Sequence, residues 1–216
     1  TGTRGTGKTT CAKILAKAVN CEHPVNGDPC CQCPSCLGLE SGSFLDVLEL
    51  DAASNNGVDQ VRALRDAAIY APANVKKRVS IVDEVHMLST AAFNALLKIL
   101  EEPPAHLMFI LATTELHKVP ATILSRCQRF SFKRILPKDI AHRLTYVAGQ
   151  EHIDLTADGA ELLSRLADGA LRDGLSLLDQ CAAAGGTVDS RAVLEVLGLA
   201  GNLQTAQLMR HSLDRN

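Results

Sequence analysis

The sequence predicts an α/β fold, a P-loop domain with a parallel sheet, followed by a small all-helical domain. A glycine-rich motif with phosphate-binding spacing opens the chain and leads into a helical pattern. Short apolar segments then alternate with amphipathic ones as far as residue 133, which is typical of parallel sheets with helices on both faces. After Pro137 only helical periodicity remains. We therefore expect one domain over residues 1–135, a helical domain over 136–199, and the start of a third domain over 200–216.

The composition is that of a globular protein and disfavours a few classes of function. Hydrophobic residues make up 46% of the 216 residues and charged residues 21%, enough for an apolar core. The net charge of −2 neither indicates nor excludes nucleic acid. Aromatic residues are only 3% and tryptophan is absent, which disfavours recognition of single strands by base stacking. No apolar run reaches about 18 residues, so we expect no membrane span and no membrane partner.

The opening segment 2–10 fits the P-loop pattern G-x-x-x-x-G-K-[ST]. Glycine lets backbone N–H groups approach phosphate oxygens that a side chain would block. Lys8 is expected to reach the β- and γ-phosphates of a nucleotide, and the Thr9 hydroxyl to complete a magnesium shell. The alternative is an ordinary glycine-rich turn. The candidate nucleotide-binding residues are Gly2, Gly5, Gly7, Lys8, Thr9 and Thr10.

A strand normally precedes a P-loop, and no such strand stands before Thr1. We therefore expect the chain to be a fragment that lacks the first strand of its domain. Nucleotide binding is expected of the parent protein more securely than of this piece.

Five of the eight cysteines lie between residues 21 and 36, in a segment rich in proline, glycine and polar residues. A P-loop protein is expected in the reducing cytoplasm, where disulfides are rare. The spacing C-x8-C-x2-C-x2-C suits four thiolates around a tetrahedral structural zinc ion. A redox pair and free thiols are the alternatives, and Cys31 is surplus to the set. The candidate zinc ligands are Cys21, Cys30, Cys33 and Cys36.

The next segments predict a strand over 44–50, a helix over 58–69 and a short strand over 79–82. The last strand delivers Asp83 and Glu84. An apolar strand followed by two acids is the Walker B arrangement, in which the first acid holds magnesium through water and the second polarises the attacking water. Paired acids at a strand end are a weak signal alone, and the P-loop upstream strengthens it.

We expect the basic stretch 74–78 to be a turn that carries solvated charge. Residues 90–102 predict a helix that ends at two prolines, and 107–112 form an apolar run typical of a strand buried on both faces. Thr113 and Thr114 follow this run, at the edge where open α/β sheets meet their ligands. Capping of the strand end is the alternative role for these two threonines.

A short helix over 120–124 and a final strand over 128–133 complete the predicted α/β domain. The remainder has helical periodicity interrupted by glycine and aspartate. Its amphipathic segments predict a small helical bundle. The predicted helices are 139–150, 157–166, 171–183 and 190–197, with a linker at 198–202.

The order of these motifs resembles the clamp-loader branch of the AAA+ ATPases. The cysteine insert narrows the resemblance to the gamma/tau family of bacterial DNA polymerase III subunits. It implies an AAA+ ATPase domain with a zinc module at about 21–36, a helical lid over 136–199, and a truncated collar domain over 200–216. The resemblance covers essentially the whole chain and rests on residues 83–88, 93–98, 100–104 and the triplet Ser125-Arg126-Cys127.

The resemblance also implies roles that spacing leaves open. Thr114, with Thr113 as candidate partner, is similar to sensor 1, which reports the γ-phosphate. Arg126 resembles the arginine finger that reaches the ATP of the neighbouring subunit, and Arg172 resembles sensor 2 of the lid. Without the resemblance, both arginines would be ordinary surface residues. The implied catalytic residues are Lys8, Asp83, Glu84, Thr114 and Arg126, and the implied magnesium ligands are Thr9 and Asp83.

The implied function is that of an ATP-hydrolysing motor subunit of the bacterial clamp loader, with ATP, magnesium and zinc as cofactors. It would belong to the DNA polymerase III complex without being the polymerising subunit. The implied partners are other clamp-loader subunits, the sliding clamp, and primer–template DNA contacted through phosphates, with Lys98 as a candidate contact. Two alternatives remain. One is a scaffold stabilised by zinc that does not hydrolyse ATP. The other is a different AAA+ DNA motor, such as a branch-migration ATPase, and this second alternative predicts that no metal is bound.

Overall fold

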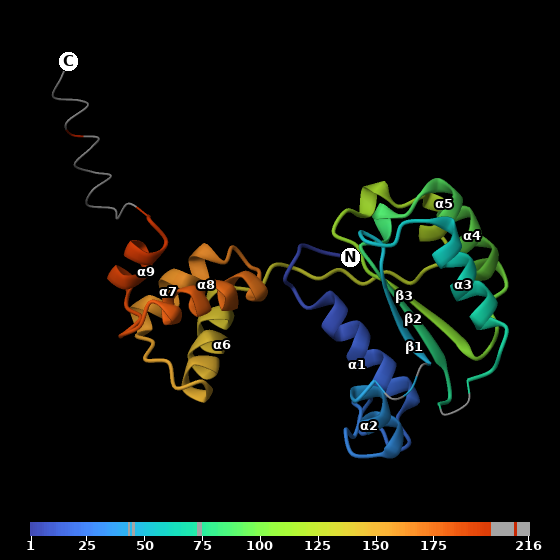
Figure 1. Cartoon of the computed structure of the whole chain (residues 1–216), viewed down its shortest axis with the longest axis horizontal. Helices are drawn as coiled ribbons and strands as arrows, with labels where there is room; N and C mark the ends of the chain where they lie inside the picture. The colour runs from blue at the N-terminus through green and yellow to red at the C-terminus, as the bar shows by residue number, and fades with distance from the viewer. Residues whose placement is uncertain (43, 45, 73–74, 200–209, 211–216) are drawn as a thin grey trace. The chain divides into compact units, whose positions relative to one another are not determined.

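The structure is a computed structural model that describes residues 1–42, 44, 46–72, 75–199 and 210. It divides into two compact units, Thr1–Phe132 and Lys133–Asn216, each with its own apolar core (Figure 1). The first is an α/β unit and the second is helical, in the predicted order. Apart from Arg210, the predicted third domain over 200–216 lies outside the described residues.

The α/β unit is built on a parallel sheet with the strand order β1-β2-β3. Asp51 pairs with Asp83, and Val82 pairs with Leu111, so the carboxyl ends of the strands reach the same edge. The predicted parallel sheet is confirmed, although its first strand begins slightly later than expected. The strands are β1 (Val47–Asp51), β2 (Arg78–Asp83) and β3 (Leu107–Leu111).

One face of the sheet is covered by α1 (Lys8–Asn20). This helix buries the small side chains of Ala12 and Ala16 against Val79 and Ile81 of β2. Because successive strand residues point to opposite faces, Val82 of β2 points to the other side of the sheet, whereas Asp83 shares the side of Val79 and Ile81.

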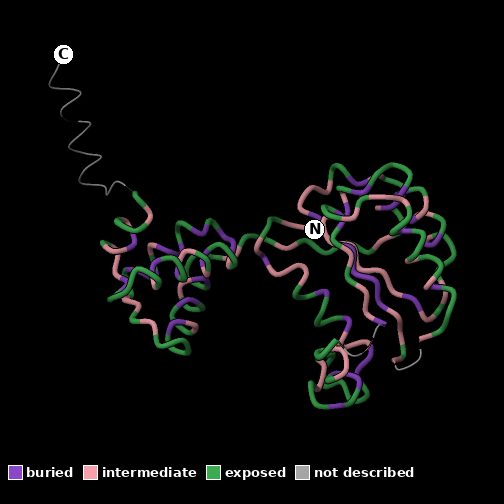
Figure 2. Tube along the Cα trace, viewed as in Figure 1, coloured by how far each residue is buried: buried purple, intermediate pink, exposed green. Residues whose placement is uncertain are grey.

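The opposite face is covered by α3 (Val58–Ala68) and α4 (Thr90–Glu101). Val61 and Leu96 of these helices are almost fully buried in one apolar cluster with Val82. Full burial of such a side chain contributes roughly 1.5–3 kcal/mol. Figure 2 shows the resulting buried layer along the strands and the inner sides of the helices. Helices therefore lie on both faces, as predicted. Shorter helices in the connections are η1 (Val85–Met87), η2 (Leu116–Lys118) and α5 (Ala121–Leu124).

The cysteine-rich insert contains a helix that the sequence did not predict. This helix, α2 (Pro34–Glu40), begins after the N-cap Cys33, whose Sγ accepts the backbone N–H of Cys36 at 3.4 Å. Pro34 occupies the first turn, where its fixed φ favours a helix. The segment showed no apolar period because the cluster beside this helix is made of cysteine side chains instead of hydrocarbon.

The prediction of a final strand over 128–133 is wrong. In the described part of the chain, this segment pairs only through an isolated parallel bridge between Gly2 and Phe132. The Phe132 amide donates to the Thr1 carbonyl at 2.8 Å, and the Thr1 amino group donates to the Phe130 carbonyl at 2.8 Å. Phe132 is therefore the one described residue of this segment that forms a strand-type bridge.

The basic stretch 74–78, expected to be solvated, is held by specific contacts where it is described. Lys76 Nζ donates to the Cys21 carbonyl at 2.6 Å, which ties the stretch to the insert. Arg78 pairs with the buried carboxylate of Asp46 at 3.1 Å. The expectation of solvated charge is therefore wrong for Arg78, whereas Lys76 is exposed as expected and also makes a contact to the insert.

The helical unit contains the predicted helices. Leu144, Leu163 and Leu178 are almost fully buried in its core. Two of the helices begin after Thr156 and Asp189, whose side-chain oxygens accept N–H groups of the first turn. The four helices are α6 (Pro137–Gln150), α7 (Ala157–Leu166), α8 (Leu171–Ala183) and α9 (Ser190–Val196).

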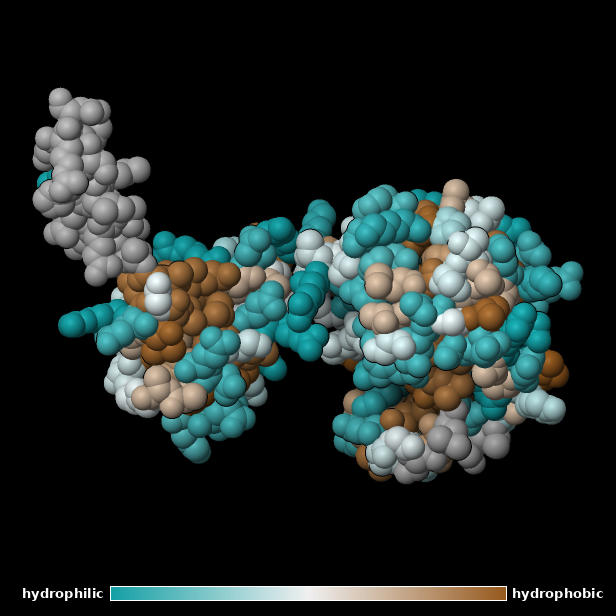
Figure 3. Space-filling model, turned by 45° about the horizontal axis from the view of Figure 1, so that its top comes forward, coloured by the Kyte–Doolittle hydropathy of each residue, from teal (hydrophilic) through white to brown (hydrophobic). Residues whose placement is uncertain are grey.

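On the face that Figure 3 shows, both units have hydrophilic side chains with apolar patches between them. Large apolar side chains that remain exposed include Tyr70, Phe130, Leu136 and Tyr146. Within the described ranges, no helix has the length and apolar character needed to cross a bilayer.

Candidate functional site

The P-loop segment runs directly into α1. Gly7, the N-cap of that helix, has a φ of 91°, a left-handed conformation that glycine adopts without steric cost. No side chain caps the helix at this residue, and a Cβ at Gly7 would meet no atom within 4 Å. The N-terminus of α1 is therefore open beside Gly7 and has no side-chain cap there, an arrangement that suits a polyphosphate. Gly5 lies in the same loop, and Thr10 is exposed on α1.

Two side chains of the motif fold back onto the loop. Lys8 Nζ donates to the Thr3 carbonyl at 2.9 Å, and Thr6 Oγ1 donates to the same carbonyl at 2.8 Å. The Lys8 ammonium group therefore lies at the loop, where it could meet phosphate oxygens that the loop holds.

Gly2 has a packing role that does not depend on a nucleotide. A Cβ at this position would lie 2.4 Å from the Phe132 carbonyl oxygen. The Gly2 amide also donates to the Thr113 carbonyl at 3.3 Å. The first glycine of the motif thus allows the start of the chain to approach the segments around residues 113 and 132.

The two predicted magnesium ligands meet directly. Thr9 Oγ1, in the first turn of α1, donates to Asp83 Oδ2, at the end of β2, at 2.7 Å. The other carboxylate oxygen, Asp83 Oδ1, accepts the Glu84 amide at 2.9 Å. A hydroxyl and a carboxylate are hard oxygen ligands of the kind that magnesium prefers, so this pair fits the ion.

Glu84 is turned toward the end of β3. Its backbone is left-handed, with a φ of 46° and a ψ of 45°, an uncommon conformation for a side chain of this size. Its Oε2 atom accepts the Thr114 amide at 3.1 Å and the Thr114 hydroxyl at 2.9 Å. The structure thus brings the predicted base and the predicted sensor threonine into contact.

His86 is a neighbour of this pair to which the sequence assigned no role. Its side chain is 6% exposed, and Nδ1 lies 3.0 Å from Thr113 Oγ1 and 3.3 Å from Glu84 Oε2. Nε2 lies 3.6 Å from Glu115, whose pKa is lowered by the hydrogen bond from Lys118. The sequence pointed to His86 only through its position, because it follows Asp83 and Glu84 in the run on which the family resemblance rests.

The two predicted arginines make contacts within their own units. Arg126 Nη2 donates to Glu101 Oε1 at 3.0 Å, and Nη1 donates to the Thr122 carbonyl at 2.9 Å. Arg172 is exposed on α8, and its carbonyl accepts the Ser176 hydroxyl at 3.0 Å. The roles that the family resemblance implied for these two arginines stay predictions.

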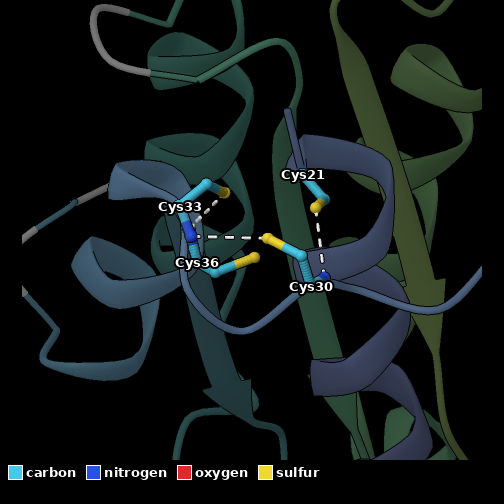
Figure 4. Close-up of side chains that lie close together, drawn as sticks. All are labelled: Cys21, Cys30, Cys33 and Cys36. Carbon is cyan, nitrogen blue, oxygen red and sulfur yellow. Dashed lines mark hydrogen bonds between the residues drawn. The ribbon is translucent and has the colours of Figure 1, made fainter. Parts of the chain in front are cut away.

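Four cysteine side chains of the insert converge on one point (Figure 4). Every pair of their Sγ atoms lies within 4.8 Å. Four thiolates around zinc, at about 2.3 Å from the ion, would place sulfur atoms about 3.8 Å apart. A small contraction would therefore give tetrahedral zinc geometry. Cys21 comes from the end of α1, Cys30 and Cys33 from the loop before α2, and Cys36 from α2 itself.

The surroundings of the cluster also fit a metal. The amides of Cys30, Cys33 and Cys36 donate to the sulfur of the preceding cysteine in the set, at 3.3 to 3.4 Å. Amide donors from Glu22 and Cys36 lower the pKa of Cys33 to about 6, whereas burial raises the pKa of Cys36 to about 12. A divalent cation would supply the positive charge that a buried thiolate lacks. Four sulfur donors without an open position fit a structural zinc ion.

Cys31 lies outside this cluster. It is exposed, and its Sγ donates to the Pro29 carbonyl at 3.6 Å. The four-sulfur group forms without it, so the geometry removes the ambiguity about the surplus cysteine. All eight cysteines are unpaired.

Comparison with protein-family models gives a match in each unit. A model described as DNA polymerase III, delta subunit, matches residues 1–136. A second, described as DNA polymerase III clamp loader subunit, ATPase lid domain, matches residues 139–187. The two matches meet close to the division between the two units of the structure.

Curated relatives are similar along the whole chain. It is 50% identical to the DNA polymerase III subunit tau of Bacillus subtilis (strain 168) and 46% identical to that of Escherichia coli (strain K12), over 100% of its length. It is 40% identical, again over 100% of its length, to the DNA polymerase III subunit gamma of Buchnera aphidicola subsp. Baizongia pistaciae. The chain spans 38%, 34% and 58% of the lengths of these relatives, in that order.

A solved structure shares the fold at low sequence identity. Thermotoga maritima RuvB, titled a Holliday junction branch migration motor, superposes with a TM-score of 0.63 over 91% of this chain and 59% of that one. The identity is 14%, so the likeness concerns the fold alone. Together with the lid match, it confirms the predicted P-loop AAA+ architecture with a helical lid.

Proposed function

The chain belongs to the clamp-loader family of DNA polymerase III, in its gamma/tau branch, and from this premise we propose that it is an ATP-hydrolysing motor subunit. The work that it would drive is the loading of a sliding clamp onto primed DNA. One observation carries the proposal: the residues that would bind phosphate, hold metal and act as base lie together at one edge of the sheet. They are Lys8, Thr9, Asp83, Glu84 and Thr114.

Binding of ATP would depend on the P-loop and on the end of β2. Lys8 and the N–H groups at the start of α1 would hold the phosphates, and Thr9 and Asp83 would hold magnesium. When bound, ATP supplies the transferable γ-phosphoryl group and magnesium supplies positive charge for its oxygens. The 2.7 Å contact between Thr9 and Asp83 supports this assignment, because both oxygens already point to one place.

Glu84 would act as the base that orients the attacking water. Thr114 donates twice to one carboxylate oxygen, and the second oxygen takes no part in these contacts. The hold on Oε2 therefore fixes the direction of the carboxylate and leaves Oε1 for a water. It also joins the base to the residue that would report the γ-phosphate.

Arg126 would serve the ATP site of a neighbouring subunit, and Arg172 would contribute from the helical unit. The Arg126 side chain is 35% exposed, and Arg172 is an exposed residue, so both side chains reach the surface of their units. An arginine delivered in this way accelerates phosphoryl transfer by roughly 10³–10⁵-fold. Hydrolysis would therefore depend on assembly of the oligomer.

The proposed partners are other clamp-loader subunits, the sliding clamp, and primer–template DNA held through its phosphates. The names of the relatives, all subunits of DNA polymerase III, support an assembly of this kind. Lys98 is exposed on α4 and is a candidate phosphate contact. The unpaired cysteines support a cytoplasmic location.

The proposed cofactors are ATP, magnesium and a structural zinc ion held by the four clustered cysteines. Zinc would order an insert that has no hydrocarbon core of its own. Bound zinc also distinguishes the proposed function from the alternative of a branch-migration motor, because that alternative predicts no bound metal. Purified protein without stoichiometric zinc would favour that alternative.

The deciding experiment is ATP turnover by the full-length assembled complex with Lys8→Ala. We expect turnover to fall by at least about 10²-fold, because the phosphates lose their main charge partner. The matched control is Lys13→Ala on the same helix, a lysine paired with Glu49 at 2.7 Å and 56% exposed. Equal turnover in wild type and Lys8→Ala would reject the motor and favour the non-hydrolysing scaffold. Clamp loading assayed with and without ATP then tests what the turnover drives.

A further inference from the structure

The guanidinium group of Arg126 is held by its own subunit. Nη2 donates to Glu101 Oε1 at 3.0 Å, and Nη1 donates to the Thr122 carbonyl at 2.9 Å. These terminal nitrogens are the atoms that would face phosphate oxygens in a bidentate contact. In this arrangement, they face acceptors of the same chain.

The backbone on both sides of this contact is firmly anchored. Glu101 is the last residue of α4, and Arg126 follows α5 after one residue. The two helices pack through an apolar cluster in which Ile123 and Leu96 are almost fully buried. Any release of Arg126 from Glu101 would therefore be a movement of the side chains, since the two backbones are fixed by the core beneath them.

We propose that Glu101 is a positioning residue that competes with the neighbour's ATP for Arg126. The inference rests on the proposed role of Arg126 as an arginine finger. While Glu101 holds the guanidinium, its terminal nitrogens are engaged and its charge is partly neutralised. Assembly around clamp and DNA shifts Arg126 from the carboxylate to the phosphate. Glu101 thereby lowers hydrolysis by complexes that are not yet loaded.

The ion pair between Arg126 and Glu101 is weak enough for Arg126 to move from the carboxylate to the phosphate. The side chains of Arg126 and Glu101 are 35% and 54% exposed, so solvent screens the pair. An exposed pair of this kind changes an equilibrium by roughly two- to five-fold. That is weak enough to be displaced by a triphosphate and strong enough to bias the resting position of the side chain.

The test is Glu101→Gln in the full-length assembled complex. ATP turnover is measured without clamp and DNA, and again with both at saturation. We expect the unstimulated rate to rise roughly two- to five-fold and the stimulated rate to stay within error, because Arg126 has already left Glu101 in the loaded complex. The matched control is Glu102→Gln, an exposed carboxylate one residue away, which leaves both rates unchanged. Equal melting temperatures show that no variant acts through folding.

Arg126→Ala in the same complex connects the effect to the finger. With Arg126→Ala inactive, the double variant with Glu101→Gln must be equally inactive. A lower rate for Glu101→Gln would mean that the carboxylate supports the finger, and an unchanged rate would mean an inert surface pair; either result overturns the inference alone. Full activity of Arg126→Ala would overturn it together with the proposed role of Arg126.

Discussion

The cysteine cluster and the candidate ATP site are built in opposite ways. The cluster takes all its ligands from residues 21–36, and three of its sulfur atoms accept an amide from the next ligand in the set. The ATP site joins Thr9 to Asp83 across 74 positions, and Glu84 to Thr114 across 30. Local backbone geometry therefore shapes the first site, whereas strand register and helix packing shape the second.

The two sites also differ in what completes them. Cys36 and Cys21 are 0% and 1% exposed and Cys30 is partly buried, so the cluster is largely shielded, and the metal ion that we propose for it would complete it without a second subunit. The proposed ATP site needs Arg126 from another subunit, and the same residue is held by Glu101 in its own. A closed site stabilises its segment in any context. A shared site can respond to assembly, which is what a motor subunit requires.

The largest expected effect tests the shared character of the ATP site. Arg126→Ala should reduce ATP hydrolysis by the assembled complex by roughly 10³-fold, because the charge on the transferring phosphoryl group loses a partner. Nucleotide affinity, measured by fluorescent-nucleotide titration, should change less than about two-fold, since the finger serves the neighbour's site. Arg129→Ala, an exposed arginine nearby, is the control. Loss of nucleotide binding in Arg126→Ala would contradict a role in trans.

The next effect tests the closed character of the cluster. Cys36→Ser should abolish stoichiometric zinc, measured by elemental analysis, because the fully buried ligand is replaced by a weaker one. Hydrogen exchange in residues 21–40 should accelerate by at least about ten-fold, while the strands keep their protection. Cys11→Ser, exposed on α1, should change neither quantity. Zinc retained at full stoichiometry in Cys36→Ser would show that the four-sulfur site is misassigned.

A smaller effect follows from the pKa values within the cluster. The pKa of Cys36 is raised to about 12, so this thiol carries a proton at neutral pH and must release it when zinc binds. Zinc affinity should therefore rise with pH through the neutral range. The pKa of Cys33 is lowered to about 6, so a further proton must leave below that pH and the dependence should become steeper. Chelator competition from about pH 5 to about pH 8 measures this slope, and a flat profile would contradict thiolate ligation.

Much of the fold was predictable because its signals are local. Alternating apolar and amphipathic segments predicted β2, β3, α3 and α4 nearly to the residue, since the strands are short apolar runs and the helices have apolar residues at helical spacing. Helix α2 was missed because it is stabilised by cysteine contacts and an N-cap sulfur, for which hydrophobic periodicity has no signal. The strand over 128–133 was wrong because, of these described residues, only Phe132 makes a strand-type bridge, and its partner is the P-loop residue Gly2 and not a strand.

The contacts of the candidate site are likewise of two kinds, those that local sequence motifs predicted and those that depend on the assembled fold. Motif spacing predicted that Thr9 and Asp83 would serve one ion, and they meet at 2.7 Å. The turn of Glu84 toward Thr114 depends on a left-handed backbone and on the pairing of β2 with β3, neither of which spacing encodes. The same holds for His86 and for the pair of Arg126 with Glu101. Contacts between side chains from different helices and strands form only when the core has assembled, so the sequence pattern alone does not predict them.

The smallest expected effect is no change in zinc content when Cys31 is replaced. It tests whether the position of a cysteine in the fold, and not merely its presence in the insert, decides which residues bind the metal. Cys31→Ser should keep full zinc stoichiometry and ATP turnover within error of wild type, because Cys31 is exposed and its sulfur contacts the Pro29 carbonyl instead of the cluster. Cys31 also has a φ of 55°, so its left-handed backbone belongs to the turn that leads the chain from Cys30 to Cys33. Cys31→Gly, which relieves that backbone, should likewise leave the metal in place. A drop in zinc content in Cys31→Ser would mean that ligands exchange within the insert, and the cluster would then be less closed than its burial indicates.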